Sequence, residues 1–579
     1  MAELEPTMAE RALTRKKGLG AYYTNPAVVD FLVAWGIEMA PGVVMDPSCG
    51  DGRFLSAAAA RGATGLIGCD LDPEAVAATS YATASLAVPT ALHQGDFFEL
   101  DPARIGPVDL VAGNPPFIRY QQFAGESRAR ALASALRVGA RLGRLAASWA
   151  PFLLHALQFL RPQGAMAMAM VVPAELAQTT YGIETLRALC ANFARIRLIA
   201  FRYNWFEEVQ QETFLLMAEG RGGRCAAAEL VPLERIDDLA RLALSETAAS
   251  VPMDVGARLG RAFLTPRARA LLDQLAALPA TMALGDLGSI ANGYVTGANA
   301  VFHCTAAEGG ERGLPADWLL PVARNSRSLR GLGFEANDVA AAERRGVAHH
   351  LIWPGDEDLF TAASTARRRA LKALIAAGEG AGIPARYKCR VRDPWWRVPG
   401  LIRPGLLLPY MIGSEPHAAV NRCGALYPNS LHGIRLASPA IAEHLALGLL
   451  TSLSLLSLEL EGRSYGGGIL KLEPTGLARV RVVLPTCPEP ELRAYLAEAD
   501  RLIRDGAFPA ASHLADQWIL ADQLGLAEAD IAELQAARAT LLERRTMRRH
   551  GGTRPGPRVE VGRSSHATAP CRPVQLCPE

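Results

Sequence analysis

The sequence GVVMDPSCGDGRF at residues 42–54 decides the class of fold. A short apolar run ends at Asp46, and glycines at positions 50 and 52 precede a helical pattern at residues 54–60. This order is typical of a buried strand, a tight loop and a helix in a doubly wound α/β sheet. Two glycines spaced by one residue also let the backbone pass close to a ligand at a helix N-terminus, although the same residues could form a plain turn.

Short apolar runs continue to alternate with helical patterns through the first 250 residues. We expect further strands at residues 66–70, 109–112, 165–172 and 214–218, and further helices at residues 73–84 and 146–160. This alternation predicts a parallel sheet with helices on both faces. Ligands bind beyond the carboxyl ends of the strands in such sheets, so the residues at those ends form the candidate site.

The next strand ends carry groups that suit a nucleoside. Asp70 ends the run LIGCD, and its carboxylate could accept both hydroxyls of a ribose. Asp70 could instead share the capping of a helix with Asp72, because Pro73 stands at a favoured first helical position. Asp96 and Phe97 follow in HQGDF and could hold an adenine by its amino group and its face.

Position 55 distinguishes two classes of cofactor. A dinucleotide-binding loop requires a third glycine there, and this chain has Leu55. Contacts to ribose and adenine without a diphosphate loop fit S-adenosylmethionine better than NAD.

The motif VDLVAGNPPF at residues 108–117 points to the chemistry. Its two prolines hold the backbone extended and rigid directly after a strand. That rigidity would aim the Asn114 side-chain oxygen and the Pro115 carbonyl at a planar amino group, with an aromatic ring beside them. Two acceptors on such a nitrogen free its lone pair for attack on a sulfonium methyl group. The alternative is a turn that only ends the strand.

The ordered motifs YYT at residues 22–24, DPSCGDG, CDLD, GDF and NPPF resemble those of the gamma-class (Taq-type) N6-adenine DNA methyltransferases of restriction–modification systems. The resemblance covers nearly all of residues 18–245 and extends more loosely to residues 295–302 and 464–474. It implies a class I S-adenosylmethionine-dependent methyltransferase domain of Rossmann-like α/β fold, followed by a mixed α+β DNA-recognition domain and C-terminal helices. It also implies S-adenosylmethionine as cofactor and double-stranded DNA as partner.

The resemblance assigns roles to the residues at matching positions. Cofactor contacts are implied for Thr24, Asp46, Pro47, Gly50, Gly52, Asp70, Asp96 and Phe97. Asn114 and Pro115 would hold the target amino group, and Pro116 completes the catalytic motif. Phe117 would stack on a base flipped out of the duplex. The adenine enzymes of this family more often have Tyr at this position, so a contact through the Tyr hydroxyl would be lost here. Phe206 could cover the other face of the base or belong to a core.

The expected activity is site-specific transfer of a methyl group to N6 of adenine in duplex DNA. The same NPP-aromatic motif occurs in methyltransferases that act on RNA amino groups or on protein glutamine, so these remain alternatives. A non-catalytic DNA-specificity subunit is a third alternative, which the intact glycine loop and NPP motif disfavour.

Charge becomes informative when the chain is divided. Residues 1–250 carry 22 basic and 26 acidic residues, residues 251–485 carry 26 and 19, and residues 486–579 carry 12 and 13. The middle segment therefore has a net charge of +7, as expected for a segment that meets a polyanion. We expect a catalytic domain at residues 1–245, a linker at 245–262, a recognition domain at 263–485, a helical region at 486–545 and a disordered tail at 546–579.

The sequence RYKCRVRDPWWR at residues 386–397 interleaves basic and aromatic residues. This pattern favours phosphate contacts together with stacking on bases or sugars. The predicted DNA contacts are Arg386, Lys388, Arg390, Arg392, Trp395 and Trp396. Both tryptophans could equally belong to a core. SYGGG at residues 464–468 could approach DNA or form a turn. The cluster of Arg544, Arg545, Arg548 and Arg549 could touch the DNA backbone, although a solvated tail is the favoured alternative.

Other features disfavour several classes of protein. The ten cysteines form no CxxC pair, so we expect no metal site. No stretch of the sequence has the pattern of a secretory signal or a membrane span, and residues 441–460 are predicted to be a buried helix, so a cytoplasmic location is expected. No lysine stands two residues after an acid, so the chain lacks the (D/E)xK motif of a fused nuclease. A restriction endonuclease, if one exists, would be a separate partner.

Overall fold

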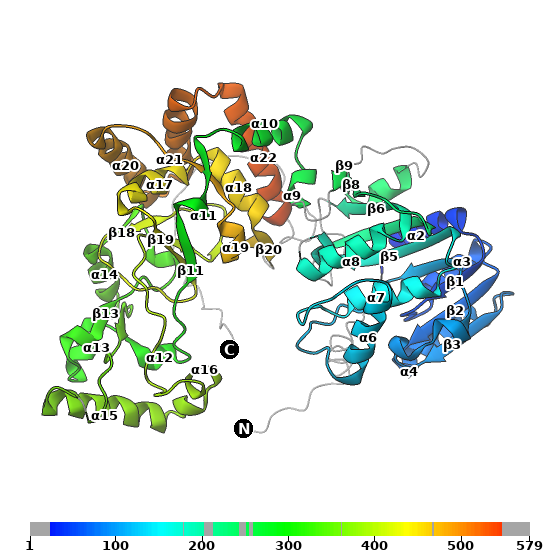
Figure 1. Cartoon of the computed structure of the whole chain (residues 1–579), viewed down its shortest axis with the longest axis horizontal. Helices are drawn as coiled ribbons and strands as arrows, with labels where there is room; N and C mark the ends of the chain where they lie inside the picture. The colour runs from blue at the N-terminus through cyan, green and yellow to red at the C-terminus, as the bar shows by residue number, and fades with distance from the viewer. Residues whose placement is uncertain are drawn as a thin grey trace, which may run out of the picture.

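The computed structural model describes residues 24–177, 179–201, 212–242, 251–253, 259–360, 362–465 and 468–546. They form two lobes that lie side by side (Figure 1). The first lobe comprises the described residues up to 253, and the second starts with helix α9 (Leu259–Ala262).

A nine-stranded sheet forms the centre of the first lobe, in the order β3-β2-β1-β4-β5-β7-β6-β8-β9. Its strands are β1 (Val43–Asp46), β2 (Gly65–Asp70), β3 (Thr90–Gln94), β4 (Leu110–Gly113), β5 (Gly164–Pro173), β6 (Phe193–Phe201), β7 (Thr213–Arg221), β8 (Ala228–Leu233) and β9 (Val251–Met253). Strands β1 to β5 pair in parallel, whereas β7 is antiparallel to both of its neighbours. The predicted α/β class with a mostly parallel sheet is confirmed.

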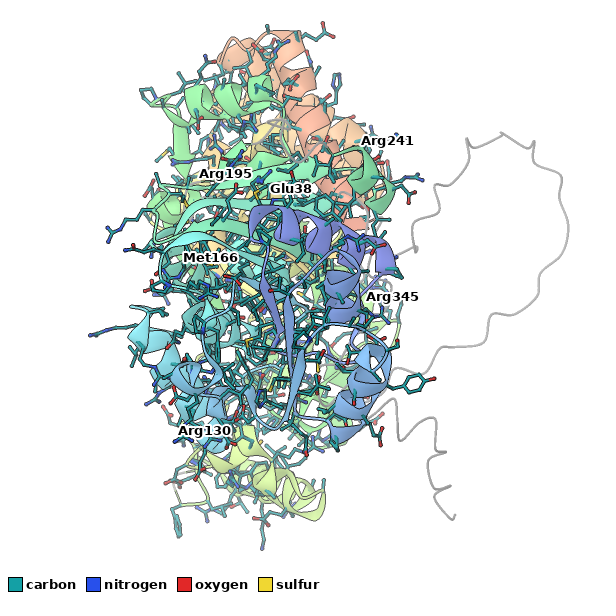
Figure 2. All side chains as sticks on the ribbon, turned by 90° about the vertical axis from the view of Figure 1, so that its right-hand side faces the viewer. Glu38, Arg130, Met166, Arg195, Arg241 and Arg345 are labelled. Atoms are coloured by element: carbon teal, nitrogen blue, oxygen red, sulfur yellow. The ribbon has the colours of Figure 1, made fainter. Side chains whose placement is uncertain are left out.

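Helices cover both faces of this sheet because successive strand residues point to opposite sides. Val44 and Leu110 pack on the side of α2 (Pro26–Met39) and α3 (Arg53–Ala60). Met45 and Val111 pack on the side of α7 (Trp149–Ala156) and α8 (Thr180–Cys190). The other helices described in this lobe are α4 (Pro73–Thr83), α5 (Pro102–Ile105) and α6 (Gly125–Arg137), besides short 3-10 turns. Figure 2 faces this lobe, with Arg195 of β6 in its upper part and Arg130 of α6 in its lower part.

The second lobe is mixed α and β. Its five-stranded sheet has the order β11-β19-β16-β18-β14, formed by β11 (Gly288–Asn292), β19 (Leu431–Leu436), β16 (Leu406–Pro409), β18 (Ala419–Asn421) and β14 (Gly333–Phe334). Smaller sheets join β12 (His303–Cys304), β15 (His350–Ile352) and β13 (Leu319–Pro321); β17 (Met411–Ile412), β21 (Ile469–Lys471) and β20 (Arg463–Tyr465); and β10 (Thr281–Ala283) with β22 (Arg481–Val483). Its longer helices are α10 (Pro266–Ala276), α14 (Ala336–Glu343), α15 (Thr365–Gly380), α17 (Ala442–Gly448), α18 (Ser452–Glu461), α20 (Glu489–Arg504), α21 (Phe508–Ala515) and α22 (Glu528–Thr546).

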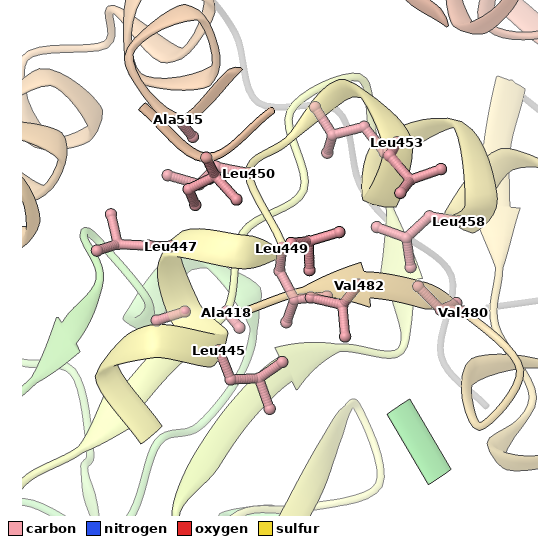
Figure 3. Packing of buried hydrophobic residues seen from close by; sticks show 14 of the residues in the cluster. Ala418, Leu445, Leu447, Leu449, Leu450, Leu453, Leu458, Val480, Val482 and Ala515 are labelled. Carbon is pink, nitrogen blue, oxygen red and sulfur yellow. The ribbon is translucent and has the colours of Figure 1, made fainter. Parts of the chain in front are cut away.

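One large apolar core joins the start and the end of the second lobe, beside smaller apolar clusters in the same lobe. It runs from Leu264 near the start of α10 to Leu541 in α22, and Figure 3 shows its centre, where α17, α18 and β22 meet Ala515 of α21. The helices that follow residue 486 therefore share a core with residues 263–485, and they close that lobe. Strand β9 extends the sheet of the first lobe past residue 245, into the segment expected to be a linker. The expected tail lies outside the described residues, apart from Thr546 at its start.

The apolar stretch at residues 441–460 forms two helices instead of the single predicted one. Both α17 and α18 contribute to the core of the second lobe. Within the described ranges, no single helix is long and apolar enough to cross a membrane. Among the described helices, one bent pair, Pro439–Gly448 and Ser452–Glu461, which meets at 88°, has the required length and composition.

Candidate active site

The order of the strands reverses between β1 and β4, and the predicted site residues follow these two strands and their neighbours. Asp46 ends β1, and Gly113 ends β4 beside it. A Cβ atom at Gly113 would lie 2.5 Å from Asp46 Oδ1, so a larger residue there would displace the Asp46 carboxylate. The loops after β1 and β4 therefore meet at the switch point of the sheet, where α/β proteins of this type bind ligands.

The glycine loop after β1 has the conformation that its sequence predicts. Gly50 and Gly52 have φ values of +55° and +79°, which side chains with a Cβ rarely adopt. Helix α4 supports the loop from behind, because Thr79 Oγ1 donates to the Gly50 carbonyl at 3.0 Å. A Cβ on Gly52 would come within 3.0 Å of Thr79, whereas a Cβ on Gly50 would have no atom closer than 4.0 Å. The backbone at Gly50 thus faces open space.

Asp70 braces this loop from the end of β2. Its Oδ2 accepts the Gly50 N–H at 3.0 Å, and its Oδ1 accepts the Asp72 N–H at 2.9 Å. Asp72 itself caps α4 by accepting the Glu74 N–H at 3.1 Å, so Asp70 is not the helix cap. Burial raises the pKa of Asp70, against the effect of both N–H donors. Each carboxylate oxygen retains acceptor capacity for a ribose hydroxyl, and that contact stays a prediction.

Asp46 is almost completely buried under the loop. Its Oδ1 accepts the Ser48 N–H at 3.1 Å, and burial raises its pKa to about 8. The start of α2 is held nearby, because Arg53 pairs with Asp51 and donates to the carbonyl of Thr24. The structure thereby brings Thr24 next to the glycine loop, as its predicted role requires. Pro47 lies in the turn between Asp46 and Ser48.

Phe97 does not present an open face. Its side chain is 4% exposed, and its ring stacks on Phe159 at 5.4 Å between centroids and packs against Phe152 at 4.6 Å. The structure favours a core role for this ring, since its predicted grip on adenine would require a free face. Asp96 lies at the end of the loop after β3, where it accepts the Phe98 N–H at 3.1 Å and pairs with Arg130 at 3.3 Å.

A neutral histidine supports the loop that carries Phe97. Burial lowers the pKa of His155 to about 4. Its Nε2 lies 3.0 Å from the Phe97 carbonyl, and its Nδ1 lies 2.7 Å from the Ser134 hydroxyl. A neutral ring satisfies both contacts by donating from Nε2 and accepting at Nδ1.

The loop after β4 connects directly to the glycine loop. Ser48 Oγ donates to the Asn114 carbonyl at 3.0 Å, so the two motifs form one site. Pro115 is buried, whereas Asn114, Pro116 and Phe117 are half-buried. The Phe117 ring packs against the cores on both faces of the sheet. Phe206 lies outside the described residues.

A second serine, which the sequence did not single out, holds the same loop from the other side. Ser148 Oγ donates to the Pro116 carbonyl at 2.5 Å and accepts the Ile118 N–H at 2.9 Å. Ser148 lies about thirty residues from this loop, outside every motif that the sequence offers. No sequence signal would have found it.

Comparisons with known proteins match both lobes. The family model described as N-6 DNA Methylase matches residues 4–184, and the model described as the C-terminal domain of Type II methyltransferase M.Eco57I matches residues 257–520. Both lobes are thus similar to DNA methyltransferases of the N6-adenine type from restriction–modification systems. The resemblance drawn from its motifs is therefore confirmed.

Two curated relatives of this methylase are Type II methyltransferases. M.XamI from Xanthomonas campestris pv. amaranthicola is 26% identical over 468 residues, which are 80% of this chain and 85% of that protein. M.BanIII from Aneurinibacillus aneurinilyticus is 28% identical over 218 residues, which are 33% of this chain and 36% of that protein.

Two similar solved structures are the type IIG restriction endonuclease BpuSI and the M protein of the type I restriction enzyme EcoKI. BpuSI is 12% identical, with a TM-score of 0.41 over 92% of this chain and 67% of that one. The EcoKI M protein is 14% identical, with a TM-score of 0.31 over 66% of this chain and 76% of that one.

The predicted DNA contacts of the methylase fall into two groups. Arg386, Lys388 and Arg390 are exposed on and beside helix α16 (Tyr387–Arg390). Arg392 has a different role, since its guanidinium donates to the carbonyls of Val295 and Thr296. Arg392 therefore holds the end of α16 against the loop at residues 295–296. The structure does not support the prediction that Arg392 contacts DNA.

The two tryptophans of this segment also have a packing role. Trp395 and Trp396 are partly buried, with ring centroids 5.9 Å apart, and they pack against two apolar clusters. A Cβ on Gly378 of α15 would lie 2.0 Å from the Trp395 ring, so that helix closes tightly over it. The structure favours the core alternative for both rings, and stacking on bases stays a prediction.

The remaining basic and glycine-rich candidates for DNA contacts instead contact other residues of the methylase. Gly468 has a φ of +73°, and a Cβ there would lie 3.0 Å from Thr546, so its close backbone neighbour is α22. Arg545 is 3% exposed and binds Glu459 through two contacts of 2.8 Å. Arg544 is buried and pairs with Glu212 of the first lobe. Neither arginine is placed to touch the DNA backbone.

Proposed function

We propose that this methylase transfers a methyl group from S-adenosylmethionine to N6 of adenine at specific sites in duplex DNA. The observation that carries the proposal is the bond from Ser48 Oγ to the Asn114 carbonyl. It joins the glycine loop, where a cofactor would bind, to the NPPF loop, where an amino group would bind. A methyl donor and an acceptor nitrogen held by these two loops would be adjacent, and such positioning supplies much of the rate in a single displacement.

The residues around the glycine loop fit the proposed cofactor. Open space above Gly50 leaves room for a ligand against the backbone, and Asp70 beside it offers oxygen acceptors for ribose hydroxyls. Asp46 provides a buried acid beneath the loop, where a cationic ligand would stabilise its charged form. S-adenosylmethionine, when bound, supplies a methyl group on a positively charged sulfur.

The NPPF loop fits an amino group that is conjugated to a ring. Asn114 and Pro115 would accept its two N–H hydrogens, which draws the nitrogen toward a tetrahedral geometry and frees its lone pair. That lone pair would then be available to the methyl group that S-adenosylmethionine would supply from the glycine loop, and the nitrogen would afterwards lose one proton. Phe117 is braced by apolar residues on both sides of the sheet, so its ring can hold the base in a fixed plane.

A paired adenine cannot reach this loop inside a duplex, so the base must leave the helix. Unstacking a base costs a few kcal/mol, and one aromatic face returns about 1–3 kcal/mol by stacking. Phe117 would therefore offset much of the cost of flipping, although the ring lacks the hydroxyl of a tyrosine.

Helix α16 is the part of the second lobe best suited to DNA. Arg386, Cys389 and Arg392, one helical turn apart, hold it against the loop at residues 295–297. Gly297 is required there, because a Cβ would lie 2.9 Å from Lys388 and 3.1 Å from the Cys389 sulfur. The residues between these anchors, apart from Cys389, are exposed to solvent, and Tyr387 and Val391 are 65% and 64% exposed.

This outward surface carries Tyr387, Lys388, Arg390 and Val391, which combine positive charge with two exposed apolar groups. Lys388 and Arg390 can contact phosphates, and Tyr387 and Val391 can contact sugars or base edges. The charge of +7 over residues 251–485 supports the same partner. A protein-glutamine methyltransferase has no need of such a surface.

Expression in a host without adenine methylation, followed by sequencing of its DNA with methyl detection, tests the proposal. We expect N6-methyladenine at one short recurring sequence. Methylation found only in RNA or protein would move the assignment to those alternatives. Unmethylated DNA, with cofactor binding retained, would support a specificity subunit. A restriction endonuclease that reads the same sequence, if one exists, would be a separate protein.

A further inference from the structure

The NPPF loop cannot hold its own shape through backbone hydrogen bonds. Pro115 and Pro116 have no N–H group, and residues 114–119 belong to neither a helix nor a strand. Backbone groups of a buried or half-buried loop need partners from elsewhere. The direction in which Phe117 points must therefore be set by residues outside the loop.

Ser148 supplies these partners on both sides of Phe117. Its hydroxyl donates to the carbonyl of Pro116 and accepts the N–H of Ile118, at 2.5 and 2.9 Å. Its backbone N–H donates to the Ile118 carbonyl at 3.0 Å. One residue thus fixes the peptide units that flank Phe117.

The hydroxyl of Ser148 is not used to cap its own helix. Serine before the first turn usually accepts an N–H of that turn. Ser148 precedes α7, has helical backbone angles of −59° and −36°, and makes no side-chain capping bond. The preference of helix starts for serine therefore does not explain this residue.

The position of Ser148 is itself fixed. The residue is 1% exposed, and its carbonyl accepts the Phe152 N–H of α7 at 3.1 Å. The next residue, Trp149, is also 1% exposed and donates from its indole to Glu175, just after β5, at 3.4 Å. The start of α7 is thus tied to the loops that follow both β4 and β5.

We propose that Ser148 is a positioning residue of the methyl-transfer reaction, which orients Phe117 and with it the flipped base. The proposal rests on the proposed function, because it assigns Phe117 to the target base. A base held at a slightly wrong angle still binds, but its nitrogen is no longer in line with the methyl group. Loss of the Ser148 hydroxyl should therefore lower the rate of transfer more than the affinity for DNA.

The test measures methyl transfer by the full-length variants Ser148→Ala, Ser148→Thr and Ser148→Cys. The substrate is an unmethylated duplex that contains the recognition sequence of the wild-type enzyme. Displacement by about 1 Å can cost on the order of 100-fold in rate. We expect kcat of Ser148→Ala to fall by about 10–100-fold, while KM for DNA and the affinity for S-adenosylmethionine stay near those of the wild type. Threonine keeps the hydroxyl and should restore kcat.

In the Ser148→Ala complex, 2-aminopurine at the target position should still brighten but with a shorter fluorescence lifetime, because the base moves against Phe117.

Thr185→Val is the matched control. It removes the hydroxyl of a completely buried residue in the same lobe, which donates at 2.8 Å to the Tyr181 carbonyl within α8. We expect this variant to keep the wild-type kcat. If Ser148→Ala does not fold, Ser148→Cys fills the same space with a weaker hydrogen-bonding group and should show the lower kcat. Wild-type kcat in Ser148→Ala, or in a folded Ser148→Cys, would overturn the proposal. A wild-type enzyme that methylates no DNA would instead refute the proposed function.

Discussion

At the scale of single residues, Asn114 is the group most directly tied to the transferred methyl group. We expect Asn114→Ala to lose methyl transfer, because removal of one positioned acceptor costs on the order of 10²–10³-fold in rate. Cofactor affinity should change little, since the Asn114 side chain is assigned to the target base. A tritiated-methyl assay measures the first effect and calorimetry the second. Wild-type turnover in this variant would refute the role assigned to the NPPF loop.

Asp46 gives the site a pH dependence. Burial raises the pKa of this carboxyl to about 8, so it is mostly protonated at pH 7 in the absence of ligand. The cationic groups of S-adenosylmethionine favour the carboxylate form, so binding at pH 7 should release a proton. Cofactor affinity should therefore rise as the pH increases toward about 8 and then level off.

Calorimetry at pH 7 in two buffers with different ionisation enthalpies measures this proton release. The binding heats should differ for the wild type and agree for Asp46→Asn, which has no proton to lose. Equal heats for the wild type in both buffers would show that Asp46 does not change its charge on binding.

At the scale of elements, α16 makes the clearest prediction about DNA. Lys388→Ala and Arg390→Ala should weaken binding to all sequences to a similar extent. In each variant the slope of log affinity against log salt concentration should also become shallower by about 1, because one phosphate contact is lost. Arg493→Ala on α20 is the control, because Arg493 is 69% exposed and lies in a helix without a proposed DNA contact. Unchanged salt slopes in both α16 variants would remove this helix from the DNA interface.

The elements that the sequence predicted have simple apolar patterns. Strands β1, β2, β4 and β5 are buried on both faces, so their apolar runs are continuous. No bounds were predicted for strand β3 before Asp96, because TALHQ lies at the edge of the sheet, is partly exposed and carries polar residues. Strand β6 was missed because Arg195 and Arg197 interrupt its pattern, and these charges are neutralised by Glu229 and Glu219 on the adjoining strands.

Candidate site residues were predictable where they are neighbours in sequence. The glycine loop and the NPPF loop are local motifs, and parallel strands bring them to one edge of the sheet. Ser148 and the anchoring role of Arg392 depend on contacts between segments 30 and 96 residues apart. Local spacing carries no information about such contacts, and an arginine that binds a carbonyl looks the same in sequence as one that binds a phosphate.

At the scale of the whole molecule, a small group of side chains joins the two lobes. Arg544 of α22 pairs with Glu212 of the first lobe, and the two side chains are only 8% and 10% exposed. The Arg544 guanidinium also lies 3.6 Å from the centre of the Phe263 ring, which packs against the cores of both lobes. Glu212 follows directly on residues 202–211, which include Phe206. The junction between the lobes is therefore adjacent in sequence to a predicted contact of the target base.

Removal of either charge at this junction should destabilise the full chain. Breaking a buried ion pair costs about 3–5 kcal/mol. Glu212→Gln and Arg544→Met should each lower the free energy of unfolding in urea, and the double variant should lose less than the sum of the two. The exposed pair of Arg501 and Glu498 on α20, at 57% and 46%, is the control and should matter little. Strictly additive losses at Glu212 and Arg544 would show that the pair does not couple the lobes.

The place of α22 in the chain affects how the protein is made. Although α22 is the last described helix, it packs against α10 near the start of the second lobe, where Arg267 pairs with Asp530 at 2.9 Å. Domains fold in order as the ribosome releases them. A nascent chain would therefore complete the sheet of the first lobe long before the second lobe acquires its closing helix. During that interval the growing polypeptide could bind a methyl donor, but its second lobe would be incomplete and could not recognise a DNA sequence. Selective modification of the genome thus begins only when synthesis has passed α22.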